Sequence, residues 1–360
     1  MSKSIIVKNL SKTYYIQKFV PPPVKIYRKI MGIKPKLEGV QALKNISFEV
    51  EKGEIFGIIG PDGAGKTTLF RILTTLLLPD NYCFLNAKDA EISQCSQVFY
   101  ASHSTDSVLC DNSSRPLRLN NDTIIQIENF NALADFQQIR NISGYMPGKF
   151  SLYMDLTVEE NLNFFATLFN TTIEENYHLI KDIYQHIEPF KTRKAGALSG
   201  GMKQKLALSC ALIHKPKVLF LDEPTTGVDP VSRKEFWEML RRLKEQEITI
   251  LVSTPYMDEA GLCDRIALIN NGEFISIDTP QNIIANFTDT LYSVEGENMY
   301  QLLLDLRKNP IVKTCYAFGD TLHVTLKDSY GLTVLRSYGL KKISPTIEDC
   351  YMNLSQNVSH

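Results

Sequence analysis

A glycine-rich loop near residue 60 constrains the fold of this chain more than any other sequence feature. Residues 60–68 read GPDGAGKTT and match the pattern G-x-x-x-x-G-K-[ST], between the apolar run 55–59 and a helical stretch. Glycines let backbone N–H groups converge on phosphate oxygens, and the following helix directs its positive N-terminal end at the same anion. A chance match in a glycine-rich turn is the competing interpretation. The order of buried strand, loop and helix favours a phosphate-binding loop in an α/β fold.

The residues of this loop have separate expected roles. We expect Lys66 to reach the β- and γ-phosphates of a nucleotide, and the Thr67 hydroxyl to bind Mg²⁺. The other positions are expected to surround the phosphates, and they are Gly60, Pro61, Asp62, Gly63, Ala64, Gly65 and Thr68. ATP and Mg²⁺ are therefore the predicted cofactors.

A pair of acidic residues follows a second apolar run. Residues 218–221 read VLFL and lead into Asp222 and Glu223, an arrangement that is costly in a buried strand unless the charges meet a cation or a reacting water. Asp222 is the candidate for holding Mg²⁺ through a water molecule. Glu223 is the candidate for accepting a proton from the attacking water. A solvated acidic strand end is the alternative interpretation.

The segment 198–204, LSGGMKQ, opens a predicted helix and carries a family resemblance. It resembles the LSGGQ signature of the ATP-binding-cassette family, with Met202 in place of the glutamine. The resemblance implies that Ser199, Gly200 and Gly201 contact the γ-phosphate that the opposite subunit of a dimer holds. On its own the segment would be interpreted as a serine-capped helix start.

The motifs also occur in the order that this family shows. Lys66, the signature, Asp222 and the segment 227–230 (GVDP) follow one another with similar gaps. The resemblance implies a nucleotide contact for Asp229. It also implies an aromatic side chain that stacks on adenine, at Tyr14 or, alternatively, Tyr15.

The resemblance covers about residues 4–286 and implies the fold class. We expect a P-loop NTPase core with a mixed sheet flanked by helices, and a helical signature subdomain at about 150–212. Residues 16–38, which contain three successive prolines, and residues 81–122, which lack helical or strand periodicity, are interpreted as insertions. Short strands alternate with helical stretches over 289–360, which predicts a small C-terminal α+β domain.

Two positions depart from the family pattern. Gly148 stands where the family has a glutamine that approaches Mg²⁺, and Pro255 stands where it has a histidine that contacts the γ-phosphate. Proline offers phosphate neither a donor nor a charge. We therefore predict that the chain alone hydrolyses ATP slowly.

Further short segments resemble multidrug-type exporters whose membrane domain is a separate polypeptide. They are residues 145–147, 156–161, 257–260 and 345–350. The resemblance implies an ATPase subunit that drives translocation through a permease by ATP-dependent dimerisation, as a homodimer or with a second cassette. The alternative is a clamp or degenerate cassette that hydrolyses little ATP and completes a partner's site.

Other cassette proteins fit the sequence less well. A cassette protein that acts on ribosomes usually carries two cassettes, and a chromosome-maintenance ATPase places a long heptad-patterned segment between the loop and the signature. This chain has one phosphate-binding loop and one signature. Neither class is therefore expected, and no nucleic-acid partner is expected.

Composition indicates where the protein works. The 39 basic and 40 acidic residues give a net charge of -1, which provides no broad attraction to nucleic acid or anionic lipid. Seven scattered cysteines indicate a reducing compartment, and no apolar run reaches the length of a membrane span. We expect a peripheral protein on the cytoplasmic face of the inner (plasma) membrane. Residues 24–31 form either a basic amphipathic membrane contact or a solvated loop.

Overall fold

The computed structural model of the chain contains two compact units. The first unit comprises residues 1–255 and 269–274, and the second comprises residues 256–268 and 275–360. Within the described part of the chain, no helix is both long enough and apolar enough to cross a membrane. The structure describes residues 2–17, 37–80, 123–328, 331 and 338–357.

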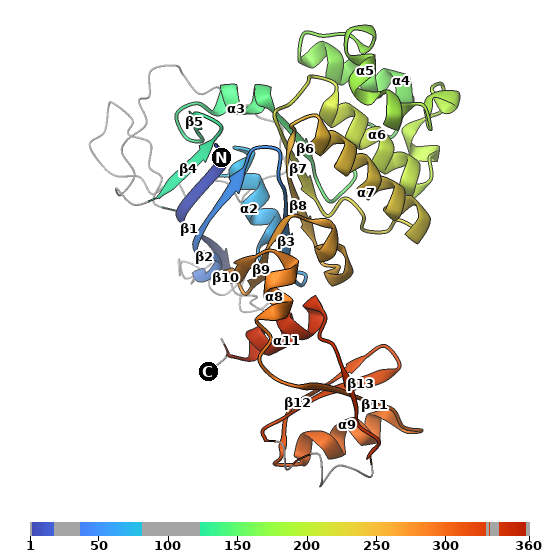
Figure 1. Ribbon diagram of the computed structural model, residues 1–360. Helices are drawn as coiled ribbons and strands as arrows, with labels where there is room; N and C mark the ends of the chain where they lie inside the picture. The colour runs from blue at the N-terminus through green and yellow to red at the C-terminus, as the bar shows by residue number, and fades with distance from the viewer. Residues whose placement is uncertain (1, 18–36, 81–122, 329–330, 332–337, 358–360) are drawn as a thin grey trace, which may run out of the picture. The chain divides into compact units, whose positions relative to one another are not determined.

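The main sheet is built on parallel strands that are buried on both faces. From one edge to the other, its six strands are β10 (Glu273–Asp278), β9 (Arg265–Asn270), β3 (Ile55–Ile59), β8 (Thr249–Thr254), β7 (Val218–Asp222) and β6 (Ser143–Met146) (Figure 1). Strands β3, β8, β7 and β6 pair in parallel, and every residue of β3, β7 and β8 is buried. Helices α2 (Lys66–Leu73), α6 (Gly200–Leu212) and α7 (Pro230–Glu245) pack against these strands. The apolar runs in the sequence therefore mark a sheet covered by helices.

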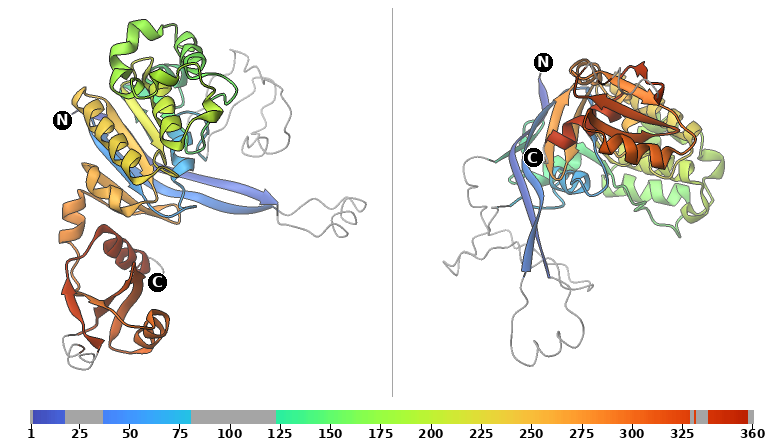
Figure 2. Two further views of the ribbon diagram at one scale, coloured as in Figure 1. Left: turned by 90° about the vertical axis from the view of Figure 1, so that its right-hand side faces the viewer. Right: turned by 90° about the horizontal axis from the view of Figure 1, so that it is seen from below.

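A second, antiparallel sheet of the first unit contains a long hairpin. Its strands, in order, are β2 (Leu37–Glu51), β1 (Lys3–Gln17), β4 (Ile124–Ile127) and β5 (Phe130–Asn131). Strands β1 and β2 have 15 residues each and run together away from the main sheet (Figure 2). The two strands pair with each other up to Gln17 and Leu37, and so reach into the segment 16–38 that the sequence analysis interprets as an insertion.

Two predictions fall on residues that the structure does not describe. The basic amphipathic element at 24–31 lies within residues 18–36, and the insertion at 81–122 is also outside the described ranges. Both stay predictions. The ends of the first insertion are different, since Ile16, Gln17, Leu37 and Glu38 belong to the paired strands β1 and β2.

The helical part of the first unit consists of α4 (Val158–Leu168), α5 (Ile173–Tyr184) and α6 (Figure 1). The short helices η2 (Glu188–Phe190) and η3 (Ala195–Ala197) lie between α5 and α6, and α3 (Phe136–Ile142) precedes β6. Helix α4 begins with a capping box, in which Thr157 and Glu160 satisfy each other's backbone N–H. A threonine followed three residues later by a glutamate specifies this helix start within a few residues of sequence.

The second unit contains a four-stranded antiparallel sheet with helices. In sheet order, its strands are β12 (Val312–Phe318), β13 (Thr321–Leu326), β11 (Leu291–Val294) and β14 (Lys341–Ile343). Helix α9 (Met299–Lys308) packs on β12 and β13, while α11 (Ile347–Asn357) contacts α8 (Pro280–Ala285) and η4 (Met257–Leu262). The alternation of short strands and helices predicted over 289–360 is therefore confirmed for the described residues.

The segment 345–350 of the second unit is held in place by the buried carboxylate of Asp349. Asp349 is fully buried, and its Oδ1 accepts hydrogen bonds from the Tyr316 hydroxyl at 2.7 Å and from His323 Nδ1 at 2.5 Å. Its Oδ2 accepts from both the backbone N–H and the hydroxyl of Thr346 at 2.7 Å. Burial acts to raise the pKa of this carboxyl, but the hydrogen bonds from His323, Thr346 and Tyr316 hold it below its usual value. Asp349 thus anchors the start of α11 to the sheet.

Candidate functional site

The loop between β3 and α2 contains positions where only glycine fits. Gly65 has a φ of +107°, and a Cβ at this residue would lie 2.5 Å from the carbonyl oxygen of Ala42. A Cβ at Gly60 would overlap the carbonyl oxygen of Ile269. Helix α2 begins at Lys66, so the free amides of its first turn lie at the end of the loop. The chain therefore has the strand–loop–helix arrangement of an anion-binding site.

The Lys66 side chain lies over the loop and is almost completely buried. Its Nζ donates to the carbonyl oxygens of Gly60 at 2.9 Å and Pro61 at 3.0 Å. The same atom lies 3.2 Å from Glu223 Oε1 and 3.9 Å from Asp62 Oδ1. The structure therefore brings the predicted loop lysine and one predicted acid into direct contact.

The acidic pair follows the carboxyl end of β7. Asp222 is 1% exposed, whereas the side chain of Glu223 is 23% exposed. Glu223 has a φ of +52°, in the left-handed region that non-glycine residues rarely adopt. Its backbone N–H donates to the hydroxyl of Ser253, and that hydroxyl donates in turn to Asp222 Oδ1 at 2.6 Å. Ser253 was not among the residues predicted from sequence.

Tyr145 is a second neighbour that the sequence did not single out. It lies on β6, opposite Phe220 of β7. Burial and the negative charge of Asp222 raise the pKa of Tyr145 to about 12, while Arg71 of α2 opposes the shift through its charge and a hydrogen bond. Tyr145 is therefore a neutral phenol beside the acidic pair at neutral pH. The sequence signal was its place in the segment 145–147, which resembles multidrug-type exporters, and that signal assigned Tyr145 no role in the site.

The signature residues lie at the start of α6. Ser199 caps this helix, and its hydroxyl accepts from the backbone N–H of Met202 at 3.4 Å. Ser199 and Gly200 are exposed. A Cβ at Gly201 would lie 2.8 Å from the Ser232 hydroxyl, so the first turn of α6 packs closely against the first turn of α7. The segment is therefore a serine-capped helix start whose first residues, Ser199 and Gly200, are exposed to solvent.

Asp229 caps the neighbouring helix α7. Its Oδ1 accepts from the backbone N–H groups of Ser232 at 3.0 Å and Val231 at 3.1 Å. These bonds, the one from Ser232 first, lower the pKa of Asp229 below its usual value. The site residues thus form two groups, with Lys66, Asp222 and Glu223 in one, and the starts of α6 and α7 in the other.

Tyr14 lies between the long hairpin and α2. Its hydroxyl is 3.3 Å from the Thr68 hydroxyl, and the Lys12 ammonium lies 5.9 Å from the centre of its ring. Tyr15 is the next residue of the same strand, so its side chain points to the opposite face of the sheet, and it is 49% exposed. The contact with the first turn of α2 makes Tyr14 the tyrosine closer to the glycine loop.

The two departures from the resembled pattern lie at different parts of the site, Gly148 beside the acidic pair and Pro255 at a strand end beside the glycine loop. A Cβ at Gly148 would lie 3.0 Å from the carbonyl oxygen of Asp222 and 3.6 Å from the Cβ of Glu223. Pro255 directly follows β8, whose last residue, Thr254, accepts a bond from the backbone N–H of Gly60. A glutamine and a histidine at these positions would therefore start next to the candidate catalytic groups.

The available metal ligands are oxygen atoms. Among the described residues, no three His, Cys, Asp or Glu side chains come together as a metal site. The Thr67 hydroxyl at the start of α2 and the buried Asp222 carboxylate at the end of β7 are each hard oxygen donors. Such donors fit Mg²⁺, which binds through one or two protein ligands together with substrate phosphates and water.

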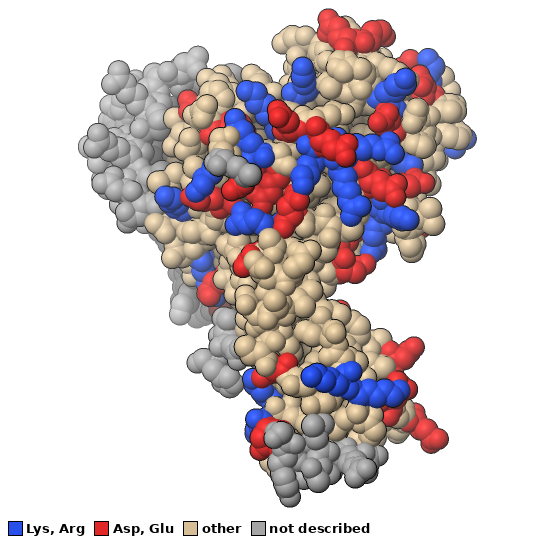
Figure 3. Space-filling model, viewed as in Figure 1, with Lys and Arg blue, Asp and Glu red and all other residues tan. Residues whose placement is uncertain are grey.

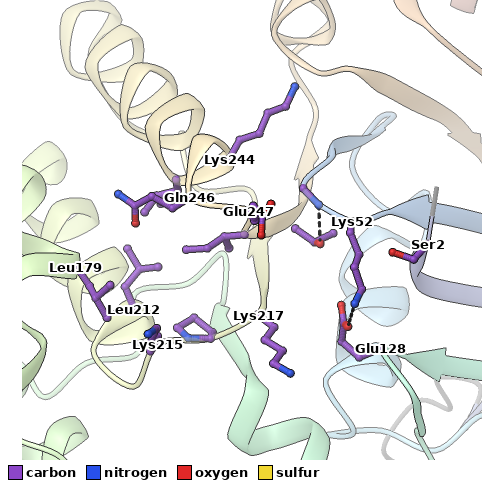
Figure 4. A pocket seen from close by; sticks show the side chains of 15 residues that line it. Ser2, Lys52, Glu128, Leu179, Leu212, Lys215, Lys217, Lys244, Gln246 and Glu247 are labelled. Atoms are coloured by element: carbon purple, nitrogen blue, oxygen red, sulfur yellow. Dashed lines mark hydrogen bonds and ion pairs between the residues drawn. The ribbon is translucent and has the colours of Figure 1, made fainter.

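A separate cavity of about 840 Å³ lies at the amino ends of the main-sheet strands, the end opposite the glycine loop (Figure 4). Its lining includes Lys52, Lys217 and Thr249, which stand at the amino ends of β3, β7 and β8. Lys52 pairs with Glu128 at 2.9 Å. Helices α6 and α7 end near this lining, and their C-terminal carbonyls attract cations. The lysines here therefore have a structural explanation, and the cavity is distinct from the glycine loop.

Comparison with known proteins gives three matches to the same group. The profile of the family described as "ABC transporter" matches residues 43–226. The "Probable multidrug ABC transporter ATP-binding protein YbhF" of Escherichia coli (strain K12) is 32% identical over 335 residues, which cover 90% of this chain and 51% of YbhF. The "Nod factor export ATP-binding protein I" of Burkholderia pseudomallei (strain 1710b) is 30% identical over 337 residues, covering 90% of this chain and 95% of that protein.

A solved structure agrees with this result at the level of fold. The ATP-binding cassette MJ0796, a dimer in a post-hydrolysis state bound to ADP and Pi, matches with a TM-score of 0.55 and 22% identity. The match covers 76% of this chain and 98% of the MJ0796 chain. The present chain spans about half the length of YbhF.

Proposed function

The chain belongs to the ABC transporter family of ATP-binding proteins, and we propose that it is the ATPase subunit of an exporter that acts through a separate membrane polypeptide. The observation that carries the proposal is the 3.2 Å approach of Lys66 Nζ to Glu223 Oε1. It unites the glycine loop and the acidic pair at one place. The words "multidrug" and "export" in the relatives' names support the direction of transport.

The residues of the first group would bind the nucleotide and promote its hydrolysis. The loop amides and Lys66 bind the phosphates. To do so, the Lys66 ammonium leaves Glu223 and contacts the β- and γ-phosphates instead. Thr67 and Asp222 would hold Mg²⁺, which when bound neutralises phosphate charge. Glu223, on a partly exposed side chain next to Lys66, accepts a proton from the attacking water. Tyr14 would stack on the adenine ring.

The second group would complete a site in another subunit. Ser199 and Gly200 are exposed at the N-terminus of α6, where free amides and the helix dipole favour an anion. They would contact the γ-phosphate bound by a partner cassette, with Gly201 and Asp229 beside them. The ATP-binding cassette MJ0796 is a dimer when bound to ADP and Pi. Residues 4–286 would act as the cassette and residues 289–360 as an accessory domain, in a homodimer or heterodimer.

An apolar patch on the first unit would receive the membrane subunit at the cytoplasmic face of the inner (plasma) membrane. Tyr153, Met154, Phe164 and Leu168 are each between 41% and 60% exposed, and the rings of Tyr153 and Phe164 are 5.0 Å apart. Exposed apolar clusters of this kind mark interaction sites. On the face drawn in Figure 3, acidic and basic side chains are instead interspersed.

Replacing Lys66 with alanine tests the proposal directly. The loop amides alone leave the γ-phosphate charge poorly neutralised, so we expect Lys66→Ala to abolish ATP binding, measured with a fluorescent ATP analogue. Lys191→Ala removes an exposed lysine paired with Glu159 and should bind ATP as the unchanged protein does. Near-normal affinity of Lys66→Ala would rule out the assignment of the loop.

A second candidate function is an ATP-dependent clamp that scarcely hydrolyses its nucleotide. Gly148 and Pro255 favour it, because Gly148 lies beside the acidic pair, Pro255 follows a strand end beside the glycine loop, and neither side chain can donate to phosphate. Single-turnover hydrolysis of bound ATP separates the two functions. The clamp binds ATP tightly and releases phosphate only when a second cassette supplies a complete site.

A further inference from the structure

Ser253, the penultimate residue of β8, lies on the strand between the one that leads to the glycine loop and the one that ends at the acidic pair. Strand β8 is flanked in the main sheet by β3, which leads into the glycine loop, and by β7, which ends at the acidic pair. The register places Ser253 opposite Asp222 and Thr254 opposite Ile59. Because the register pairs them on adjacent strands about 4.8 Å apart, a side chain as short as serine reaches its neighbour.

The Ser253 hydroxyl makes two hydrogen bonds, and both go to the acidic pair. It donates to Asp222 Oδ1 at 2.6 Å and accepts from the backbone N–H of Glu223 at 3.0 Å. The backbone oxygen of Ser253 accepts from the same N–H at 3.0 Å. Ser253 has no exposed surface, so water does not compete for these bonds. The one hydroxyl proton is committed to the carboxylate.

We propose that Ser253 is a positioning residue for the metal-binding and water-activating carboxylates. Its proton fixes one oxygen of Asp222, which sets the orientation of the other oxygen for the ion. Its lone pair and backbone oxygen hold the amide of Glu223, whose backbone adopts the strained φ of +52°. The inference rests on the proposed function, because it assumes that Asp222 and Glu223 act on Mg²⁺-bound ATP.

A purely structural role makes a different prediction. A buried carboxylate needs hydrogen-bond partners wherever it lies, so loss of the serine hydroxyl could lower stability alone. The chain contains a matched case, since the Ser4 hydroxyl donates to Glu128 Oε1 at 2.5 Å and both residues are buried. That pair lies on the antiparallel sheet around β1 and β4. Ser4→Ala is therefore a control for the removal of a buried serine–carboxylate bond.

The test measures ATP affinity over a Mg²⁺ titration and in excess chelator, together with the melting temperature. Groups that orient a metal ligand typically change metal affinity by about 10–100-fold when removed. We therefore expect Ser253→Ala to raise the Mg²⁺ concentration for half-maximal ATP binding by about tenfold or more, with little change in chelator. Ser253→Thr keeps the hydroxyl, so its Mg²⁺ dependence should be close to that of the unchanged protein. Ser4→Ala should lower the melting temperature and leave the Mg²⁺ dependence unchanged.

The outcomes separate this inference from the proposed function. If unchanged protein binds ATP with a clear Mg²⁺ dependence and Ser253→Ala shows the same dependence, the positioning role is wrong while the proposed function stands. If unchanged protein binds no ATP, both are wrong. If Ser253→Ala does not fold, Ser253→Cys replaces it, because a thiol is close in size but a weak donor.

Discussion

Restoring the two side chains that depart from the family pattern should accelerate hydrolysis. The perturbation is Gly148→Gln together with Pro255→His, which adds one donor beside the acidic pair and one next to the strand end at the glycine loop. Loss of one preorganised donor near a transition-state charge typically costs about 10²–10³ in rate. The two groups act on the same charge, so their effects do not multiply in full. The upper bound on the gain is therefore about 10³.

The structure reduces this bound. A Cβ at residue 148 would stand 3.0 Å from the Asp222 carbonyl oxygen, a distance at which one of the two must move by a few tenths of an ångström. The atom that must yield belongs to the backbone of the acidic pair itself. A misplacement of about 1 Å can cost 10²-fold in rate, so part of the gain is lost. We expect a net increase of about tenfold in the steady-state rate.

The assay is phosphate release by the purified protein, with the Glu223→Gln variant measuring background ATPase. Gly148→Ala combined with Pro255→His is the matched control, because it adds the same Cβ without the amide. It should be slower than the glutamine variant. The reasoning is refuted if unchanged protein already turns over at about 1–100 per second and the double variant gains nothing, since other residues then fill these roles.

Two further predictions concern assembly and the second unit. Glu223→Gln should slow hydrolysis while sparing ATP binding, and so trap a closed dimer. The prediction is contradicted if gel filtration with ATP and Mg²⁺ shows only monomer, with or without the natural partner. The depressed pKa of Asp349 stabilises the second unit above about pH 4, and this stability should be lost as the pH falls through the folded pKa. Asp349→Asn should lower the free energy of unfolding of the second unit by about 2 kcal/mol at neutral pH and make that free energy less sensitive to acid. Hydrogen exchange of β12 and β13 measures both effects, and an unchanged pH profile in the variant would contradict the prediction.

The sequence by itself determined the family, the glycine-rich loop between β3 and α2, and the start of α4. These features are local, because the glycine pattern of residues 60–68 and the capping box of Thr157 and Glu160 each specify a backbone geometry within a few residues. The same holds for the apolar runs at β3 and β7, since burial on both faces requires continuous apolar residues. The roles of the site residues remain proposals.

Only the tertiary structure decided which residues surround these motifs. Ser253 meets Asp222 because β8 pairs with β7 in one particular register, and a pairing between segments about thirty residues apart in the chain is not written in either segment. Tyr145 comes beside the acidic pair for the same reason, through β6. The length of the β1–β2 hairpin likewise depends on pairing up to Gln17 and Leu37, across residues whose local pattern indicated a loop. Register is set by the burial of whole strand faces, so it becomes defined only when the sheet assembles.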